Sequence, residues 1–292
     1  MILLILSKKR EQMDIQREIE QLAEGFNGRL ALSCLNLQTN ETVAYHDNEQ
    51  FPTASAIKLG IVAALMALVD GGKSSLDEPI MLRRADHVTG SGVLRHLSPG
   101  LTMPLRDWAF LMMNISDNLA TNVLIDYVGL DNIQSWLNEA GFADVQLHRP
   151  ISFGTPPPDK PHIGTATAAG LTRLITAVFR RQLLSPAACN EMMRLMDGVG
   201  ADRVGRYLPF AYYGSDEDEA TQLHLAGKTG TIKGVRVQTA VVWRGTWQDN
   251  NGFVITAMTQ DDPAPELWST DAAGNLLIGR LARLMYDAVF TG

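Results

Sequence analysis

The hydrophobic pattern of this chain changes its period twice, and that change limits the possible folds more than any other feature. Near the N-terminus, and again after residue 222, apolar side chains alternate with polar ones as in strands, whereas helical spacing dominates between these regions. Both ends of the chain therefore supply strands, and the middle supplies helices. This order predicts an α+β fold: an antiparallel sheet built from both chain ends, with N- and C-terminal helices packed on it, and an all-α part inserted between them.

The same pattern predicts the individual elements. Strands are expected over Arg29 to Leu37, Thr42 to Tyr45, Leu223 to Thr231, Val235 to Arg244 and Phe253 to Thr259. Helices are expected over residues 14–24, 56–69, 105–113, 119–127, 133–139, 166–181, 186–196 (with Ser185 as N-cap) and 271–289. Residues 150–164 are expected to form an irregular loop, and the acidic run 215–219 a solvated turn. We expect a single domain over 14–290, with an α/β part at about 14–52 and 200–290 and an all-α part at about 53–199.

The composition is that of an ordinary soluble protein: 292 residues, 46% hydrophobic and 20% charged, with a formal net charge of −7. This acidic balance, with scattered basic residues, argues against nucleic acid and anionic membranes as partners. The longest apolar stretch, Leu59 to Val69, is too short for the ~20 residues that cross a bilayer. The N-terminal apolar run precedes its positive charges, the reverse of a secretory signal, so we expect a cytoplasmic protein or one that has lost its leader.

The cysteines and histidines form no pattern that holds a metal or a cofactor. Cys34 and Cys189 are too few for a disulfide scaffold or a cysteine-based zinc site, and we expect both thiols to be buried. The histidines show no zinc-ligand spacing; they are His46, His87, His96, His148, His162 and His224. The tryptophans are expected to pack in the core or between subdomains; they are Trp108, Trp136, Trp243, Trp247 and Trp268. We therefore expect neither a metal nor a cofactor.

Ser55 and Lys58 open a very apolar predicted helix, in the sequence Ser55-Ala56-Ile57-Lys58. A spacing of three puts both side chains on one helical face, one turn apart. A lysine that is desolvated by apolar neighbours can have its pKa lowered enough to take a proton from a serine hydroxyl. Taken alone, the pair is better explained as a capping serine and a solvated lysine, because about one S-x-x-K match is expected in any chain of this length.

Two further motifs contain polar residues that could carry chemistry, although each motif taken alone has a structural explanation. Ser116-Asp117-Asn118 lies between two predicted helices, where alone it indicates an N-cap cluster. Lys228-Thr229-Gly230, followed by Thr231, lies inside a predicted strand, where a charged lysine is costly unless it faces a cleft. The glycine of this motif would let another backbone or a ligand approach closely. Alone, this motif is also explained by a lysine on an edge strand.

Together, the three motifs in this order are far rarer than any one of them. S-x-x-K followed by S-D-N and K-T-G is the signature of class A β-lactamases and penicillin-binding proteins. The spacing from Ser55 to Ser116 and the residues around each motif also resemble that family. By this resemblance, which runs from about Asp14 to Val289, the chain is identified as a member of the class A β-lactamase and penicillin-binding serine hydrolase family, and the fold expected for it is serine β-lactamase-like.

The resemblance implies a catalytic role for four residues. Ser55 would be the nucleophile that becomes acylated, and Lys58 would take its proton, directly or through water. Ser116 would pass a proton to the leaving nitrogen. Lys228 would supply positive potential that helps to keep Lys58 neutral and attracts a substrate carboxylate.

By the same resemblance, the remaining residues of the motifs would bind the substrate. Asn118 would hydrogen-bond the amide of the substrate's side chain and Lys58. Thr229 and Thr231 would hold the substrate carboxylate, with Gly230 between them on the strand, and the backbone N–H groups of Thr231 and of the nucleophile would form the oxyanion hole. Arg236, on the next strand, would be either a second carboxylate anchor or a structural surface arginine.

The resemblance fails at one position. Class A enzymes carry a glutamate in an E-x-x-L-N motif, in a loop after the S-D-N helices, that activates the deacylating water. Laid against that pattern, the glutamate position falls near Ile151, and no glutamate occurs between Glu139 and Glu191. Because isoleucine cannot polarise water, we expect an acyl-enzyme at Ser55 to hydrolyse slowly unless another group substitutes.

Three titratable residues of this loop are the candidates for that substitute: Asp159, His148 and His162. Asp159 is more simply expected to pair with Arg149 and brace the loop. The two histidines are more simply expected to lie on the loop surface.

The sequence thus predicts a serine acyl-hydrolase that opens a β-lactam through a Ser55 acyl-enzyme and deacylates slowly. The alternative is a penicillin-binding, peptidase-like or esterase-like protein that acylates without efficient β-lactam turnover. The expected partner is a small-molecule β-lactam or a related amide or ester, and the oligomeric state is left open. Relatives of this type usually work in the periplasm or outside the cell, which contrasts with the expectation from the N-terminus.

Overall fold

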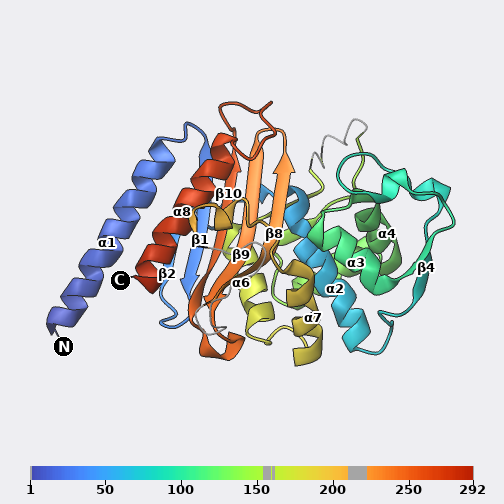
Figure 1. The fold of residues 1–292 in the computed structure, drawn as a ribbon, viewed down its shortest axis with the longest axis horizontal. Coiled ribbons are helices and arrows are strands. Elements are labelled where there is room, and N and C mark those ends of the chain that lie inside the picture. The colour runs from blue at the N-terminus through green and yellow to red at the C-terminus, as the bar shows by residue number, and fades with distance from the viewer. Residues whose placement is uncertain (1, 154–158, 160–161, 210–221, 292) are drawn as a thin grey trace.

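A five-stranded sheet, in which strands from both ends of the chain lie side by side, forms the centre of the molecule (Figure 1). The structure, a computed structural model, describes residues 2–153, 159, 162–209 and 222–291, with side chains from Met13 on. The strand order is β2-β1-β10-β9-β8, and each neighbouring pair is antiparallel. The bounds are Arg29–Asn36 (β1), Thr42–Tyr45 (β2), Leu223–Ile232 (β8), Val235–Arg244 (β9) and Gly252–Gln260 (β10). The predicted α+β fold with its antiparallel sheet is confirmed.

Helices cover both faces of this sheet, because successive side chains of a strand point to opposite faces. α8 (Ala273–Phe290) lies on one face with α1 (Ile2–Glu24) beside it, and α6 (Ala168–Phe179) lies against the other face (Figure 1). In β9, Val242 packs in the core on the α8 side, whereas Val241 packs in the core on the α6 side. Alternation along the strands therefore divides the apolar side chains between two cores.

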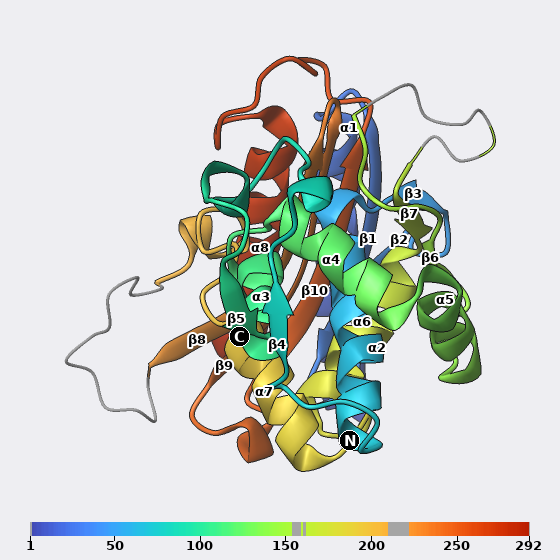
Figure 2. The ribbon, with the colours of Figure 1, turned by 90° about the vertical axis from the view of Figure 1, so that its right-hand side faces the viewer.

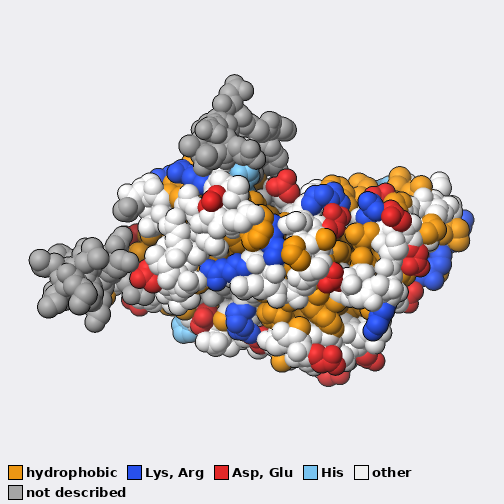
Figure 3. Space-filling view, turned by 90° about the horizontal axis from the view of Figure 1, so that it is seen from below, with side chains coloured by type: hydrophobic (Ala, Val, Ile, Leu, Met, Phe, Trp, Pro, Cys, Tyr) orange, Lys and Arg blue, Asp and Glu red, His pale blue; other side chains and the backbone are white. Residues whose placement is uncertain are grey.

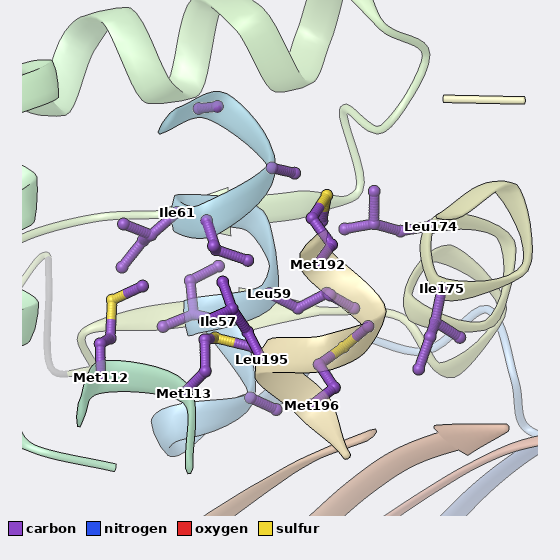
Figure 4. Packing of buried hydrophobic residues seen from close by; sticks show 14 of the residues in the cluster. Ile57, Leu59, Ile61, Met112, Met113, Leu174, Ile175, Met192, Leu195 and Met196 are labelled. Carbon is purple, nitrogen blue, oxygen red and sulfur yellow. The ribbon is translucent and has the colours of Figure 1, made fainter. Parts of the chain in front are cut away.

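The inserted helices surround α2 (Lys58–Asp70), whose residues from Lys58 to Met66 are all buried. This burial explains why the segment is apolar all round instead of amphipathic. The neighbouring helices are α3 (Leu105–Asn114), α4 (Asn118–Val128), α5 (Leu130–Glu139) and α7 (Pro186–Met196) (Figure 2). Methionines of α3 and α7 gather around α2 (Figure 4). Their flexible thioether side chains suit an irregular gap between helices that cross at different angles.

The structure adds short elements that the pattern did not predict. They are β3 (Phe51–Pro52), β4 (Pro79–Met81), β5 (Thr102–Pro104), β6 (Val145–Leu147) and β7 (Gly164–Ala166). β3, β7 and β6 form one small sheet, and β4 pairs with β5. Strands of two or three residues are too short to show an alternation, so only tertiary pairing defines them.

Several expectations need correction. The helix expected from Ala56 begins as a 3₁₀ turn over Ala54–Ile57, with the α-helix starting at Lys58. The irregular loop expected to Gly164 ends in β7, and part of that loop, like the acidic run 215–219, lies outside the described residues. Trp268 is 57% exposed, so the expectation that it packs in the core is wrong.

Other expectations are confirmed. Ser185 caps α7, because its hydroxyl accepts the Ala188 N–H at 3.3 Å. Cys34 and Cys189 are buried and free. On the face drawn in Figure 3, acidic and basic side chains are interspersed with apolar ones. In the described part of the chain, we find no helix with the length and apolar character needed to cross a membrane. The predicted division into an α/β part and an all-α part stays a prediction.

Candidate active site

Ser55 lies on a 3₁₀ turn that connects β3 to α2 and packs directly against β8. The residue before it, Ala54, has a φ of 45°, a left-handed conformation that costs energy for a residue other than glycine. A Cβ atom at Gly230 would lie 2.2 Å from the carbonyl oxygen of Thr53. Only glycine therefore lets β8 approach this turn so closely, and the K-T-G strand runs beside the predicted nucleophile.

Lys58 is completely buried, and oxygen atoms of the S-D-N motif surround its amine. Its Nζ lies 2.8 Å from the Ser116 carbonyl oxygen, 3.0 Å from the Ser116 Oγ and 3.3 Å from the Asn118 Oδ1. Burial, and secondarily the charge of Lys228, hold the pKa of Lys58 well below its ordinary value, although Asp117 acts in the opposite direction. The lysine is thus set up as a neutral amine, which can accept a proton.

The S-D-N motif keeps its position because Asp117 ties two segments together. Its carboxylate caps α4 by accepting the Ala120 N–H at 3.0 Å, and it also accepts the N–H groups of Val93 and Leu94 at 2.7 and 3.0 Å. The Asn118 amide donates to the Thr89 carbonyl at 3.2 Å. The N-cap role expected for this motif is therefore present, together with the contacts to Lys58.

Lys228 is buried in β8 and donates to the Thr229 carbonyl at 3.2 Å. Burial, followed by the charge of Arg203, lowers the pKa of Lys228 to about 7. Thr229 and Thr231 lie half-buried on the same strand. The amine is therefore divided between its charged and neutral forms near neutral pH.

Arg203 belongs to this site and was not predicted. Its guanidinium donates to the Gly230 carbonyl at 3.1 Å, to the Val237 carbonyl at 2.8 Å and to the Thr231 Oγ1 at 3.0 Å. It is 6% exposed, and burial lowers its pKa to about 10. No motif includes this residue, and its contacts depend entirely on tertiary packing, so the sequence carries no signal for it.

Arg236 holds backbone in place instead of lying on the surface. Its guanidinium donates to the carbonyls of Ile232 and Val235 at 2.9 and 2.8 Å and to that of Leu267, and it lies 5.7 Å from the Trp268 ring. The side chain is fully buried, so the surface alternative is wrong. These bonds occupy both terminal nitrogens of the guanidinium.

A cavity of about 260 Å³ is lined by the predicted nucleophile and by two of the predicted substrate-binding residues, whereas Lys58, Ser116 and Lys228 lie outside its lining. Ser55, Asn118 and Thr231 contribute polar atoms to its lining. The apolar side chains that line it are Ile151, Phe153, Ile163, Ile232 and Trp268, and further polar residues are Ser91, Arg149, Ser152 and His162. The predicted nucleophile therefore borders a largely apolar pocket.

Ile151 lines this cavity at the predicted glutamate position. It is 8% exposed, and the Asn122 side chain clamps its backbone, accepting the Ile151 N–H and donating to the Ile151 carbonyl, both at 2.8 Å. The clamp fixes the backbone, but an aliphatic side chain points where a base would be needed.

The neighbouring loop residues are only partly as expected. Arg149 donates to the Pro150 carbonyl at 3.3 Å and to the Ser152 hydroxyl at 3.1 Å; among the described residues, the ion pair expected with Asp159 is not formed. His148 Nε2 lies 3.0 Å from Thr165 Oγ1. Within the ranges given above, no cluster of histidine, cysteine and carboxylate side chains could hold a metal ion.

Comparisons with known proteins agree with this geometry. The β-lactamase PSE-4 of Pseudomonas aeruginosa is 25% identical over 146 residues, which are 50% of this chain and 50% of that protein. The chain thus spans about half the length of the first curated relatives it matches. The crystal structure of a β-lactamase from Sphaerobacter thermophilus DSM 20745 has a TM-score of 0.81 and 28% identity, covering 95% of this chain and 97% of that one.

A third similarity concerns the fold alone. A leucine-to-glutamate mutant of PBP-A, solved as an acyl-enzyme complex with penicillin G, has a TM-score of 0.78 and 24% identity, covering 94% of this chain and 96% of that one.

A comparison with family models identifies the family. The model of the β-lactamase enzyme family matches residues 14–289, which is most of the chain. The resemblance predicted from the three motifs is confirmed: the chain belongs to the β-lactamase enzyme family.

Proposed function

We propose that this chain is a serine acyl-hydrolase of the class A β-lactamase type, which opens a β-lactam through an acyl-enzyme at Ser55 and releases the product slowly. The observation that carries the proposal is the buried amine of Lys58, which lies 3.0 Å from the Ser116 hydroxyl and 3.3 Å from the amide oxygen of Asn118, a residue that lines the same cavity as Ser55. A neutral amine in this position can move protons both from the nucleophile and to the leaving group.

Acylation follows from these positions. Lys58 takes the proton of the Ser55 hydroxyl, directly or through a water, and the Ser55 Oγ attacks the substrate carbonyl carbon. The backbone N–H groups of Ser55 and Thr231 stabilise the oxyanion. When the C–N bond breaks, Ser116 gives its proton to the leaving nitrogen and is reprotonated by Lys58, whose amine it already contacts.

The substrate carboxylate is held at the β8 end of the cavity. Thr229 and Thr231 donate hydrogen bonds to it, and Lys228 and Arg203 make this end of the site positive, with Arg203 orienting the Thr231 hydroxyl. Asn118 binds the amide of the substrate's side chain. Arg236 contributes indirectly, because its bonds to backbone carbonyls support the wall that carries Trp268.

The second candidate is a penicillin-binding, peptidase-like or esterase-like protein that acylates without efficient β-lactam turnover. Ile151 is the observation that favours it. Its side chain occupies the wall where the family's glutamate would activate water, and it cannot accept a proton. Both candidates share the acylation step and differ in what happens to the acyl-enzyme.

One experiment separates the candidates: incubation with a fluorescent penicillin and with nitrocefin, followed by mass spectrometry. The proposal predicts a covalent adduct on the wild type, slow colour change with nitrocefin, and no adduct on Ser55→Ala. A permanent adduct without colour change supports the penicillin-binding candidate. Rapid nitrocefin hydrolysis with no detectable adduct contradicts slow deacylation, and neither label nor colour change points to another ester or amide.

A further inference from the structure

We propose that His162 is the general base for hydrolysis of the Ser55 acyl-enzyme, replacing the glutamate that Ile151 excludes. This inference rests on the proposed function, because it concerns the second half of the same reaction. It assigns the water-activating role to a residue that no motif of the chain includes.

The backbone brings residue 162 to the level of the nucleophile. β3 and β7 pair antiparallel, with Phe51 opposite Ala166 and Pro52 opposite Thr165, and the Thr53 N–H continues this ladder by donating to the Gly164 carbonyl at 3.1 Å. β7 also contacts the 3₁₀ turn over Ala54–Ile57, which carries Ser55, and His162 lies two residues before the start of β7. The 3₁₀ turn then directs the nucleophile into the cavity.

The cavity supplies the second observation. His162 and Ser55 both line the pocket of about 260 Å³, on whose wall Ile151 also lies. The imidazole is half-buried and, among the described residues, has no hydrogen-bond partner. The residue therefore borders the same space as Ser55, where a water could lie between the imidazole and the acylated serine.

The surroundings of His162 favour its neutral form. Burial lowers its pKa below the ordinary 6.5, and the charges of Arg149 and His148 act in the same direction. A neutral imidazole accepts a proton at physiological pH, which isoleucine cannot do. A base with a lowered pKa is also a weaker base, which is consistent with slow deacylation.

The step balances without any further reactant. His162 takes one proton from a water while the water oxygen bonds to the carbonyl carbon of the Ser55 ester. When the tetrahedral intermediate collapses, the bond from that carbon to the Ser55 Oγ breaks, and the imidazolium returns the proton to Oγ. The products are the carboxylic acid and the free serine, and His162 is neutral again.

The other two loop candidates fit this role less well. His148 is bonded to Thr165 and does not line the cavity, and Asp159 is exposed. His148 is therefore a matched control for His162: it is the same residue type, at the same loop, and it contributes to the same local charge.

The test separates acylation from deacylation in the full chain. The proteins are labelled with a fluorescent penicillin, excess reagent is removed, and loss of the adduct is followed by mass spectrometry from about pH 5 to about pH 9. We expect His162→Gln to acylate like the wild type and to lose the adduct about a hundredfold more slowly. His148→Gln should lose it at nearly the wild-type rate.

Two readouts do not depend on the stability of one variant. In the wild type, adduct loss should rise with pH through the lowered His162 pKa and then level off, and this rise should be absent in His162→Gln. Added imidazole should accelerate adduct loss in His162→Ala but not in the wild type. Equal adduct loss in the wild type and His162→Gln overturns the inference alone, whereas no adduct on the wild type overturns the proposed function as well.

Discussion

Two buried lysines define this site at the level of single residues, and burial affects both in the same direction. Lys58 and Lys228 are each completely buried, and their nearest charged neighbours are mostly positive. Placing such amines in the interior costs stability, because desolvation disfavours their charged form and neither is paired with a buried carboxylate that would offset it fully. The roles that we propose for Lys58 in proton transfer and for Lys228 in anion attraction would therefore be gained at the expense of folding free energy.

Replacing Lys228 should make this cost measurable. The folded-state pKa is lowered to about 7 from 10.5, so between these values the unfolded chain binds the proton and the folded one does not. Wild-type stability therefore rises with pH across this window, and the destabilisation is largest at and below about pH 7. We expect Lys228→Met to raise the free energy of unfolding near pH 7 by a few kcal/mol, on the order of 1 to 4, and to abolish acylation.

Urea unfolding of the wild type and Lys228→Met at about pH 7 and about pH 9.5 checks this prediction. The difference between their unfolding free energies should be smaller at the higher pH. If the two unfolding free energies are equal at pH 7, or if their difference grows as the pH rises, burial of Lys228 is not what limits stability.

At the level of elements, Arg236 connects three backbone segments. Its side chain extends from β9 to the carbonyls of the β8–β9 turn, at Ile232 and Val235, and to Leu267 in the loop before α8. A buried guanidinium that satisfies several carbonyls contributes more than an exposed ion pair. The positions of the β8–β9 turn and of the loop that carries Trp268 thus depend on the Arg236 side chain.

Arg236→Ala should therefore lower the free energy of unfolding by about 3 kcal/mol and increase hydrogen exchange in residues 262–270. The control is Arg283→Ala, which removes an exposed ion pair with Asp287 and a hydrogen bond to the Tyr207 carbonyl at 3.3 Å, and which should change stability far less than Arg236→Ala does. Unchanged stability of Arg236→Ala with a strongly raised KM for a substrate that carries a carboxylate would favour the direct anchor.

The elements that could be predicted from sequence are those whose pattern is long enough to repeat. β9 and α7 have the predicted bounds, Val235–Arg244 and Pro186–Met196, because alternation and an N-cap mark them clearly. β3 and β7 have two or three residues, and their pairing follows from the position of α2 and not from their own sequence. The register that brings His162 toward Ser55 therefore could not be predicted.

The residues of the candidate site also differ in whether the sequence predicts their contacts. The contacts of Lys58 with Ser116 and Asn118 were expected from the family resemblance, because all three residues belong to motifs that carry it. Arg203 reaches the K-T-G strand from a loop without any motif. The pairing of Arg149 with Asp159 was expected from charge alone, and charge along a loop does not fix which groups meet.

The whole molecule has two cores that share the sheet. The larger core joins the inserted helices to one face of the sheet, so that α2 and α6 pack in the same cluster as Val241 of β9. The second core lies between the opposite face and α8, with Ile19 of α1. Neither the helical insertion nor the sheet could keep its apolar surface out of water without the other.

This arrangement predicts that the α/β part and the all-α part unfold together although they are separate in sequence. Tryptophan fluorescence reports the unfolding of both parts, because Trp136 lies on α5 and Trp243 lies on β9. Trp243 packs against Phe179 of α6. We expect urea unfolding of the variants Trp136→Phe and Trp243→Phe, followed by fluorescence, to give in each variant a midpoint that agrees with the circular dichroism midpoint of that same variant. Each substitution shifts stability slightly, so each variant's own circular dichroism serves as its reference. Two separated transitions, with the fluorescence of the helical part changing first, would mean that the larger core is divided at the sheet and that the catalytic residues come from two independently stable units.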